Sequence, residues 1–260
     1  MIVSPMDQPT VFDEPLEAEP PAPLPRRVAY RHRLPTRLWH WVNALTVFVM
    51  LMSGLMIFNA HPHLYWGKFG ANFDHPWLTF SGRPIPGWAT IPSNYNLAAA
   101  RRWHLAFAWL LSIGLILFLV TSLINRHAQR DLAPTREEVR PSHVWRDIRE
   151  HARLRFPTGD AALRYNILQK FSYVAVISIL LPLMIFTGLA MSPAMNAAWP
   201  WLLDIFGGRQ SARSIHFICA MLLLAFIVVH LVMVFLAGPI NEIGSMITGR
   251  FRVPPQREEA

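Results

Sequence analysis

The chain has 260 residues, of which 53% are hydrophobic and only 15% are charged, and its mean hydropathy is positive at +0.27. This balance excludes an ordinary soluble domain and indicates a membrane protein. The net charge of +8 comes from arginines that lie between apolar segments, and no nucleic-acid-binding motif accompanies them, so we expect no nucleic-acid partner.

The N-terminal region, residues 1–35, is rich in proline and glutamate before it turns basic at Arg26 and Arg27. Such a composition cannot bury enough apolar surface to fold, so we predict a disordered cytoplasmic tail. It also lacks the apolar core and small-residue cleavage site of a secretory signal. The membrane domain is expected over residues 36–252, followed by a short tail over 253–260.

Four apolar segments follow the N-terminal tail, each close to the roughly 20 residues that a helix needs to cross a bilayer. Trp39 and Trp41 lie at the start of the first apolar segment and are expected to be interfacial anchors. Pro182 lies inside the third segment, where its missing N–H should kink the helix. The four predicted spans cover residues 41–58, 103–124, 171–191 and 215–237.

Lysine and arginine are distributed unevenly between the two sides of the predicted bundle. Eighteen lie in the two tails and the loop 125–170, against six in the loop 59–102 and the loop before the fourth span. Because cytoplasmic segments carry the excess of positive charge, both termini are expected in the cytoplasm, in a bacterial inner membrane. The sequence therefore predicts an all-α membrane protein: a four-transmembrane-helix bundle with cytoplasmic termini and interfacial amphipathic helices.

The segments between the spans have distinct compositions. The loop 59–102, periplasmic in this topology, is aromatic rather than solvating. It is interpreted either as a cap on the helix ends or as a docking surface for a periplasmic partner. Residues 134–149 predict a basic amphipathic helix at the lipid surface, and residues 239–249 predict a short interfacial helix.

Four histidines lie in or at the ends of the spans, where ionisable groups are costly and indicate function. His216 and His230 are fourteen residues apart, which in a helix returns to within about 40° of one face and covers roughly 21 Å. In the predicted topology His40 matches the depth of His230. His104 matches the depth of His216. The other histidines, expected to be solvated or interfacial, are His32, His61, His63, His75, His127, His143 and His151.

Two imidazoles that face each other across a helix bundle are what a six-coordinate haem iron needs as axial ligands. We therefore predict one haem between His40 and His230. A second haem is predicted between His104 and His216. Since both axial positions are then filled, electron transfer is favoured and no catalytic residue is expected. Cys219 is the only cysteine, which excludes an intrachain disulfide and a Cys-x-x-Cys-His attachment, so the haems are expected to be non-covalent.

Two further groups are candidates for contact with haem. Arginines beside the histidines can pair bidentately with haem propionates; the alternatives are a topology signal or contact with lipid phosphate. Gly54 follows His40 by fourteen residues, so a flat ring could approach the helix there, the alternative being ordinary helix packing. The candidate arginines are Arg37, Arg101, Arg102 and Arg213.

With these residues in view, the chain resembles the di-haem cytochrome b family that includes membrane subunits of nickel-iron hydrogenases, formate dehydrogenase-N and thiosulfate reductase. The family pairs the histidine of the first helix with the deeper histidine of the fourth, as the depth argument does. Residues 238–250 and the aromatic loop look most like the thiosulfate-reductase-type subunits. The resemblance covers residues 33–252 and rests on Arg37-Leu-Trp-His40-Trp, Arg102-Trp-His104, a third span without histidine, and His216 with His230.

The resemblance implies two haems b and transmembrane electron transfer, in a respiratory chain, between membrane quinone and a periplasmic oxidoreductase of the molybdenum-cofactor type. By the same analogy, quinone would lie near the cytoplasmic haem, framed by residues such as Trp39 and Asn43. The direction of electron flow stays open. Alternatives are a hydrogenase cytochrome b subunit, a stand-alone quinone-reactive oxidoreductase, and a proton-coupled transporter with a histidine relay, which the absence of aspartate and glutamate from the predicted spans disfavours.

Overall fold

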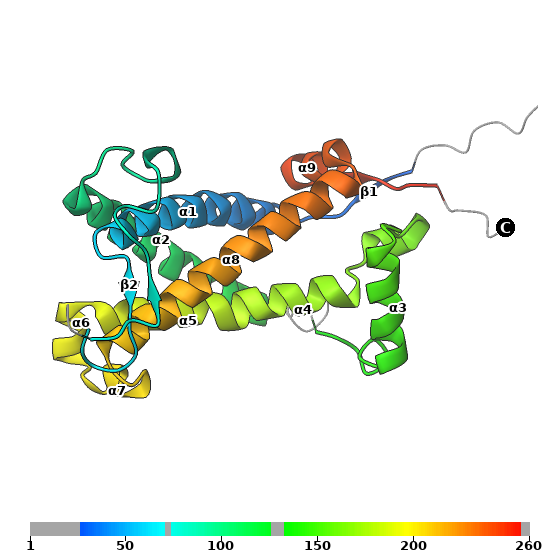
Figure 1. Cartoon of the computed structure of the whole chain (residues 1–260). Helices are drawn as coiled ribbons and strands as arrows, with labels where there is room; N and C mark the ends of the chain where they lie inside the picture. The colour runs from blue at the N-terminus through cyan, green and yellow to red at the C-terminus, as the bar shows by residue number, and fades with distance from the viewer. Residues whose placement is uncertain (1–26, 71–73, 126–132, 256–260) are drawn as a thin grey trace, which may run out of the picture.

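A computed structural model of the chain describes residues 27–70, 74–125 and 133–255. Four long helical segments form a bundle in which α8 crosses the others (Figure 1). Each is long and apolar enough to span a membrane, which confirms the four predicted spans and the helical-bundle fold class. They are α1 (Leu34–Asn59), α2 (Leu97–Ile124), the run of α4 (Ile167–Ala175), η4 (Val176–Leu180) and α5 (Leu181–Met191), and α8 (Arg209–Ala237).

Shorter elements sit at the ends of these segments. The predicted basic helix of residues 134–149 is α3, which begins only at Pro141 because residues 136–139 form a turn. The predicted helix of residues 239–249 is confirmed as α9. The short helices are η1 (Gly87–Ala89), α3 (Pro141–Ala152), η3 (Gly159–Leu163), α6 (Pro193–Ala198), α7 (Trp201–Ile205) and α9 (Pro239–Thr248). The strands are β1 (Val28–Tyr30), β2 (His63–Leu64), β3 (Leu78–Thr79) and β4 (Arg250–Arg252).

The ends of the spans carry ordinary helix signals. The Asn96 side chain accepts a hydrogen bond of 2.9 Å from the Ala99 N–H at the start of α2, and Asn166 with Gln169 forms a capping box at the start of α4. Both satisfy backbone N–H groups that the first helical turn leaves unpaired. At the other end of α8, Gly238 adopts the left-handed conformation, with φ of 108°, which favours glycine and ends the helix.

The third span contains a π-helical turn in front of its proline. η4 lies directly between α4 and α5, and the Leu181 N–H reaches back to the Val176 carbonyl. Pro182, in the first turn of α5, has no N–H to donate and its ring crowds the preceding turn, so the wider π-turn accommodates it. The predicted break in this helix is therefore present as a π-turn.

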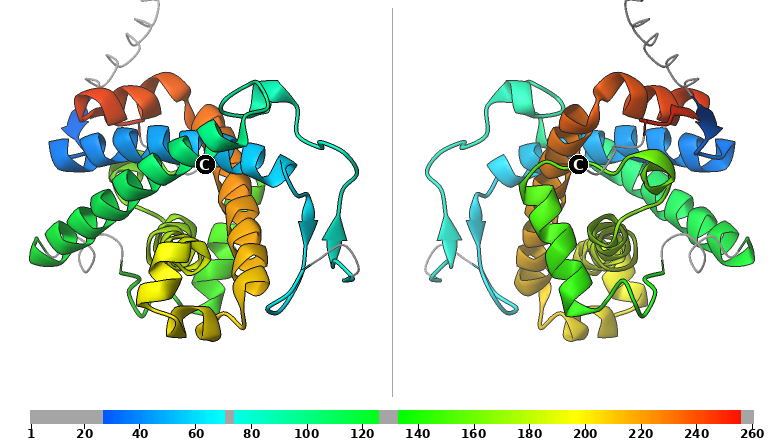
Figure 2. Two further views of the ribbon diagram at one scale, coloured as in Figure 1. Left: turned by 90° about the vertical axis from the view of Figure 1, so that its left-hand side faces the viewer. Right: turned by 90° about the vertical axis from the view of Figure 1, so that its right-hand side faces the viewer.

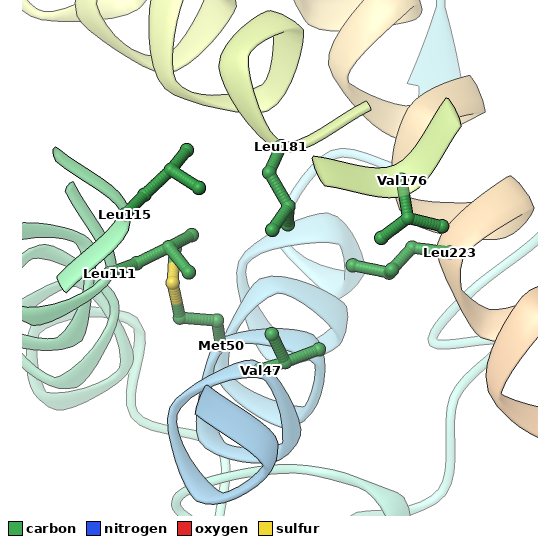
Figure 3. Packing of buried hydrophobic residues seen from close by; sticks show 7 residues of the cluster. All are labelled: Val47, Met50, Leu111, Leu115, Val176, Leu181 and Leu223. Atoms are coloured by element: carbon green, nitrogen blue, oxygen red, sulfur yellow. The ribbon is translucent and has the colours of Figure 1, made fainter. Parts of the chain in front are cut away.

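The four segments meet in a small apolar core at mid-bundle, shown in Figure 3. Outside it, large apolar side chains stay exposed, such as Leu117 on α2 and Val229 on α8, both about 60% exposed. Apolar side chains on an outer face are stable when that face meets lipid rather than water. The core cluster consists of Val47, Met50, Leu111, Leu115, Val176, Leu181 and Leu223.

Both described ends of the chain meet at one end of the bundle, which we call the terminal end. β1 pairs antiparallel with β4, and Ala29 lies opposite Phe251. Beside them, α9 packs near the start of α1 (Figure 2), where the Arg31 guanidinium contacts the Glu242 carboxylate at 3.1 Å. The expected disordered tail of residues 1–35 is corrected here, because β1 and the start of α1 fall within it; residues 1–26 and 256–260 lie outside the described residues.

His32, expected to be solvated, is instead buried in this packing, with 8% of its surface exposed. Burial, together with the positive charge of Arg31, lowers the pKa of His32 to about 4. The terminal end thus contains a neutral, buried histidine that the sequence did not reveal.

The opposite end of the bundle, which we call the loop end, is covered by the aromatic loop. Its β2–β3 hairpin lies against the start of α8: the Ser214 hydroxyl donates to the Tyr65 carbonyl at 2.6 Å and accepts from the Trp77 indole N–H at 3.0 Å. The Gly67 carbonyl accepts from the Gln210 N–H at 3.1 Å. The loop therefore forms a cap on a helix end, one of its two predicted interpretations.

Candidate functional site: two histidine pairs

The structure brings His104 of α2 and His216 of α8 together near the loop end. Their ring centroids lie 6.2 Å apart, with the ring planes at 62°. Both rings are partly buried between helices. This is the pairing that the depth argument predicts.

The second pair joins His40 of α1 with His230 of α8, towards the terminal end. Their ring centroids lie 6.4 Å apart and the planes meet at 58°. Phe226 stacks on the His230 ring at 5.9 Å, and Trp41 packs edge-on against His40 at 5.1 Å. One helix, α8, thus supplies a histidine to each pair.

The separation within both pairs suits a metal ion held between two imidazoles. An imidazole nitrogen binds a transition metal at about 2 Å, and the ring centre lies about 1 Å behind it, so two opposed ligands place their ring centres about 6 Å apart. The observed 6.2 and 6.4 Å match this value. Within the described residues no cluster of three or more histidine, cysteine, aspartate or glutamate side chains could hold a bare metal ion. Two protein ligands suffice when the metal arrives with four ring nitrogens of its own, as in haem.

Hydroxyl groups support the His104–His216 pair. The Ser53 Oγ lies 3.1 Å from His104 Nδ1, and the Thr187 Oγ1 lies 2.9 Å from His216 Nδ1. Both hydroxyl residues are fully buried. Each contact engages the nitrogen on one side of its ring and leaves Nε2 for a metal.

Glycines stand next to these hydroxyl residues. A Cβ added at Gly54 would lie 3.3 Å from His104 Cε1, and one at Gly188 would lie 3.6 Å from His216 Cε1. Gly54, predicted to admit a flat ring beside its helix, therefore lies against an imidazole. Ser53 and Thr187 are not among the residues predicted from the sequence, although Ser53-Gly54 and Thr187-Gly188 form two similar dipeptides in separate spans.

The His40–His230 pair has a different environment. His40 Nδ1 and Arg37 Nε are buried, and neither has a hydrogen-bond partner within the described part of the chain. Two buried polar nitrogen atoms without partners at one site are costly unless a ligand satisfies them. The Arg37 Nη1 donates to the Ile247 carbonyl at 2.7 Å, so the guanidinium is positioned and still has an unused N–H.

The other candidate arginines differ in their surroundings. Arg101 and Arg102 are exposed at the start of α2. Arg213 donates to the His63 carbonyl at 3.1 Å and to the His61 carbonyl. It therefore fastens the loop to α8 in this structure, and its predicted pairing with a propionate stays a prediction.

His104 with His216, and His40 with His230, would each hold one haem. A haem held by two histidines would supply electron transfer rather than chemistry on a bound substrate. The two histidines of α8 are fourteen residues apart, which corresponds to about 21 Å along the helix axis. The arrangement can relay electrons between the two ends of the bundle.

Comparison with known proteins supports the same chemistry. Residues 31–249 match the family described as prokaryotic cytochrome b561. A protein of Azospira oryzae named as a protein-methionine-sulfoxide reductase subunit, YedZ1, is 25% identical over 76% of this chain and 86% of its own length. Proteins named as Ni/Fe-hydrogenase B-type cytochrome subunits are 23% identical, in Cupriavidus necator over 78% of each chain and in Azotobacter vinelandii over 77% of this chain and 78% of the relative.

No solved structure gives a significant match. The family match nevertheless spans most of the chain, including all four paired histidines. The chain therefore belongs to the prokaryotic cytochrome b561 family and is a transmembrane, haem b-binding electron-transfer protein.

Proposed function

We propose that the chain carries electrons across a bacterial inner membrane through two haems b, one at each histidine pair. The observation that carries this proposal is the repeated geometry of the pairs, with ring centroids 6.2 and 6.4 Å apart at two depths of one bundle. The His40–His230 haem is proposed to exchange electrons with membrane quinone, and the His104–His216 haem with a partner oxidoreductase.

The proposed orientation places both termini in the cytoplasm and the loop end in the periplasm. It is supported by the arginines of the terminal end, where α3 alone contains Arg146 and Arg149, since cytoplasmic flanks carry the excess of positive charge. In this orientation the aromatic loop is available to a periplasmic partner.

The proposed partner is the catalytic subunit of an oxidoreductase. The relatives are named as subunits of a protein-methionine-sulfoxide reductase and of Ni/Fe hydrogenases, so this chain is proposed to serve one enzyme of this general kind. More specifically, we propose that the partner is a molybdenum-cofactor enzyme, because the chain resembles thiosulfate-reductase-type subunits. A hydrogenase is the alternative partner.

The test is to purify the full chain in detergent, measure haem per polypeptide, and add a quinol. We expect two non-covalent haems b per chain, both reduced by quinol in the absence of any partner. A chain that contains no haem, or haem that quinol does not reduce, contradicts the proposal.

The partner is proposed to dock on the exposed aromatic side chains of the loop. Phe69 and Trp88 are 82% and 83% exposed, and exposed aromatics of this kind commonly anchor interfaces. Replacing both with serine should slow electron transfer to the co-purified enzyme and leave both haems in place. The control is Trp145→Ser, because Trp145 is also exposed, at 60%, but lies on α3 at the terminal end. Equal rates in the loop variant and the control would exclude this docking surface.

A further inference from the structure

The hydrogen-bond directions at the His104–His216 pair can be worked out from the groups present. The Ser53 hydroxyl lies 3.2 Å from the Met50 carbonyl, and the Thr187 hydroxyl lies 2.6 Å from the Leu183 carbonyl. A carbonyl only accepts, so each hydroxyl uses its single hydrogen there. Its lone pairs are then what it presents to the histidine.

It follows that Nδ1 of each histidine is the donor. With a hydroxyl oxygen that accepts facing Nδ1 of each ring, the neutral imidazole has its proton on Nδ1 and a free lone pair on Nε2. An acceptor behind a metal-binding imidazole fixes the ring orientation and makes the ligand more basic.

On the basis of the proposed function, we propose that Ser53 and Thr187 are positioning residues for the haem at His104 and His216. They hold both imidazoles in the Nδ1–H form and lower the reduction potential of that haem, because a more basic ligand favours ferric iron. The action is selective. Across the described residues no hydroxyl forms a hydrogen bond with His40 or His230, and His40 Nδ1 is buried without a hydrogen-bond partner.

The test compares Ser53→Ala, Thr187→Val and the double variant in the purified full chain, by redox titration of both haems. We expect the midpoint of one haem to rise and that of the other to stay unchanged. Each lost hydrogen bond should change the ferric–ferrous equilibrium constant of that haem by about threefold, within the usual net worth of one hydrogen bond. The double variant should also bind that haem about tenfold more weakly.

Matched controls separate this effect from loss of a buried hydroxyl in general. Thr46 is buried at 1% exposure, like Thr187, and its hydroxyl donates to the Val42 carbonyl at 2.7 Å. Ser112 likewise donates to the Ala108 carbonyl at 2.7 Å. Thr46→Val and Ser112→Ala should leave both midpoints in place, whereas an equal shift in these controls would overturn the proposal.

Thr187→Ser keeps a hydroxyl at position 187. It therefore tests the positioning role even if the double variant loses its haem. It should retain the haem and the parental midpoint. A Thr187→Ser chain with the shifted midpoint of Thr187→Val would overturn the positioning role, as would two unshifted midpoints in the double variant. Either outcome leaves the proposed function standing, whereas absence of haem from the parental chain would remove the function itself.

Discussion

The two histidine pairs have nearly the same separation but differ in what surrounds them. The His104–His216 pair is supported by two buried hydroxyls and two close glycines. The His40–His230 pair is flanked by aromatic rings and by buried nitrogen atoms of His40 and Arg37 without partners. The first site is therefore preorganised by the protein alone, whereas the second depends on its ligand to satisfy its polar groups.

The comparison shows that equal ligand residues need not make equal sites. α8 offers its two histidines fourteen residues apart on nearly one face, so the difference comes from the neighbouring helices. α1 presents Ser53 and Gly54 to His104, and α5 presents Thr187 and Gly188 to His216. If each pair holds a haem, as we propose, these different surroundings are expected to give the two haems different reduction potentials.

The largest effect confined to one pair is expected for Gly54→Ala. The added Cβ would lie 3.3 Å from His104 Cε1, so the imidazole must shift and the haem of the His104–His216 pair should bind about tenfold more weakly. Haem retention during dilution, followed by absorbance, measures this effect. Gly114→Ala is the control, because a Cβ there meets nothing within 4 Å. Equal loss of haem from the Gly54→Ala and Gly114→Ala variants would show that the contact with His104 does not cause the weaker binding.

A smaller effect, limited to the loop end, is expected for Arg213→Gln. It removes the charged donor to the His61 and His63 carbonyls and should cost about 1–3 kcal/mol of local stability. Faster amide hydrogen exchange in residues 61–67, with the His40–His230 haem unaffected, is the expected result. The exposed Arg101 provides the matched Arg101→Gln control, and unchanged exchange in the Arg213 variant would refute the fastening role.

A third effect concerns the terminal end and its pH dependence. Burial lowers the pKa of His32 from 6.5 to about 4, so between these values the unfolded segment binds a proton that the folded segment does not. Stability of the β1–β4 packing should therefore fall as pH drops from 6.5 towards 4, and be constant above 6.5. Hydrogen exchange of residues 28–30 measures this dependence. His32→Gln should remove this pH dependence of hydrogen exchange. An equally steep pH dependence in the variant would show that another group causes it.

Hydropathy and periodicity were sufficient to predict the four spans and the two histidine pairs. Span length and charge distribution set the depth of each histidine, and helix geometry relates His216 to His230. These properties belong to single segments, or to segments that the membrane orders, so they can be predicted from the sequence. By contrast, the faces on which neighbouring helices contact each other depend on the whole fold and cannot be predicted from one segment.

The features that could not be predicted from the sequence depend on contacts between different segments of the chain. Ser53 and Thr187 look like ordinary intramembrane hydroxyls until α2 and α8 place histidines beside them. β1 is a three-residue strand whose partner, β4, lies at the other end of the chain, so local composition favoured a tail. Arg213 next to a membrane boundary also suits a propionate or a lipid, and only the folded loop assigns it the carbonyls of His61 and His63.

We propose that each histidine of α8 serves a different haem. The most direct test of this proposal is the haem content and low-temperature absorption spectrum of His216→Ala and His230→Ala, each purified as the full chain. We predict that each variant retains one haem, that the retained haems differ in spectrum and midpoint potential, and that the two spectra sum to that of the parental chain. Loss of the same haem from both variants, or equal loss of both haems from each, would contradict the account.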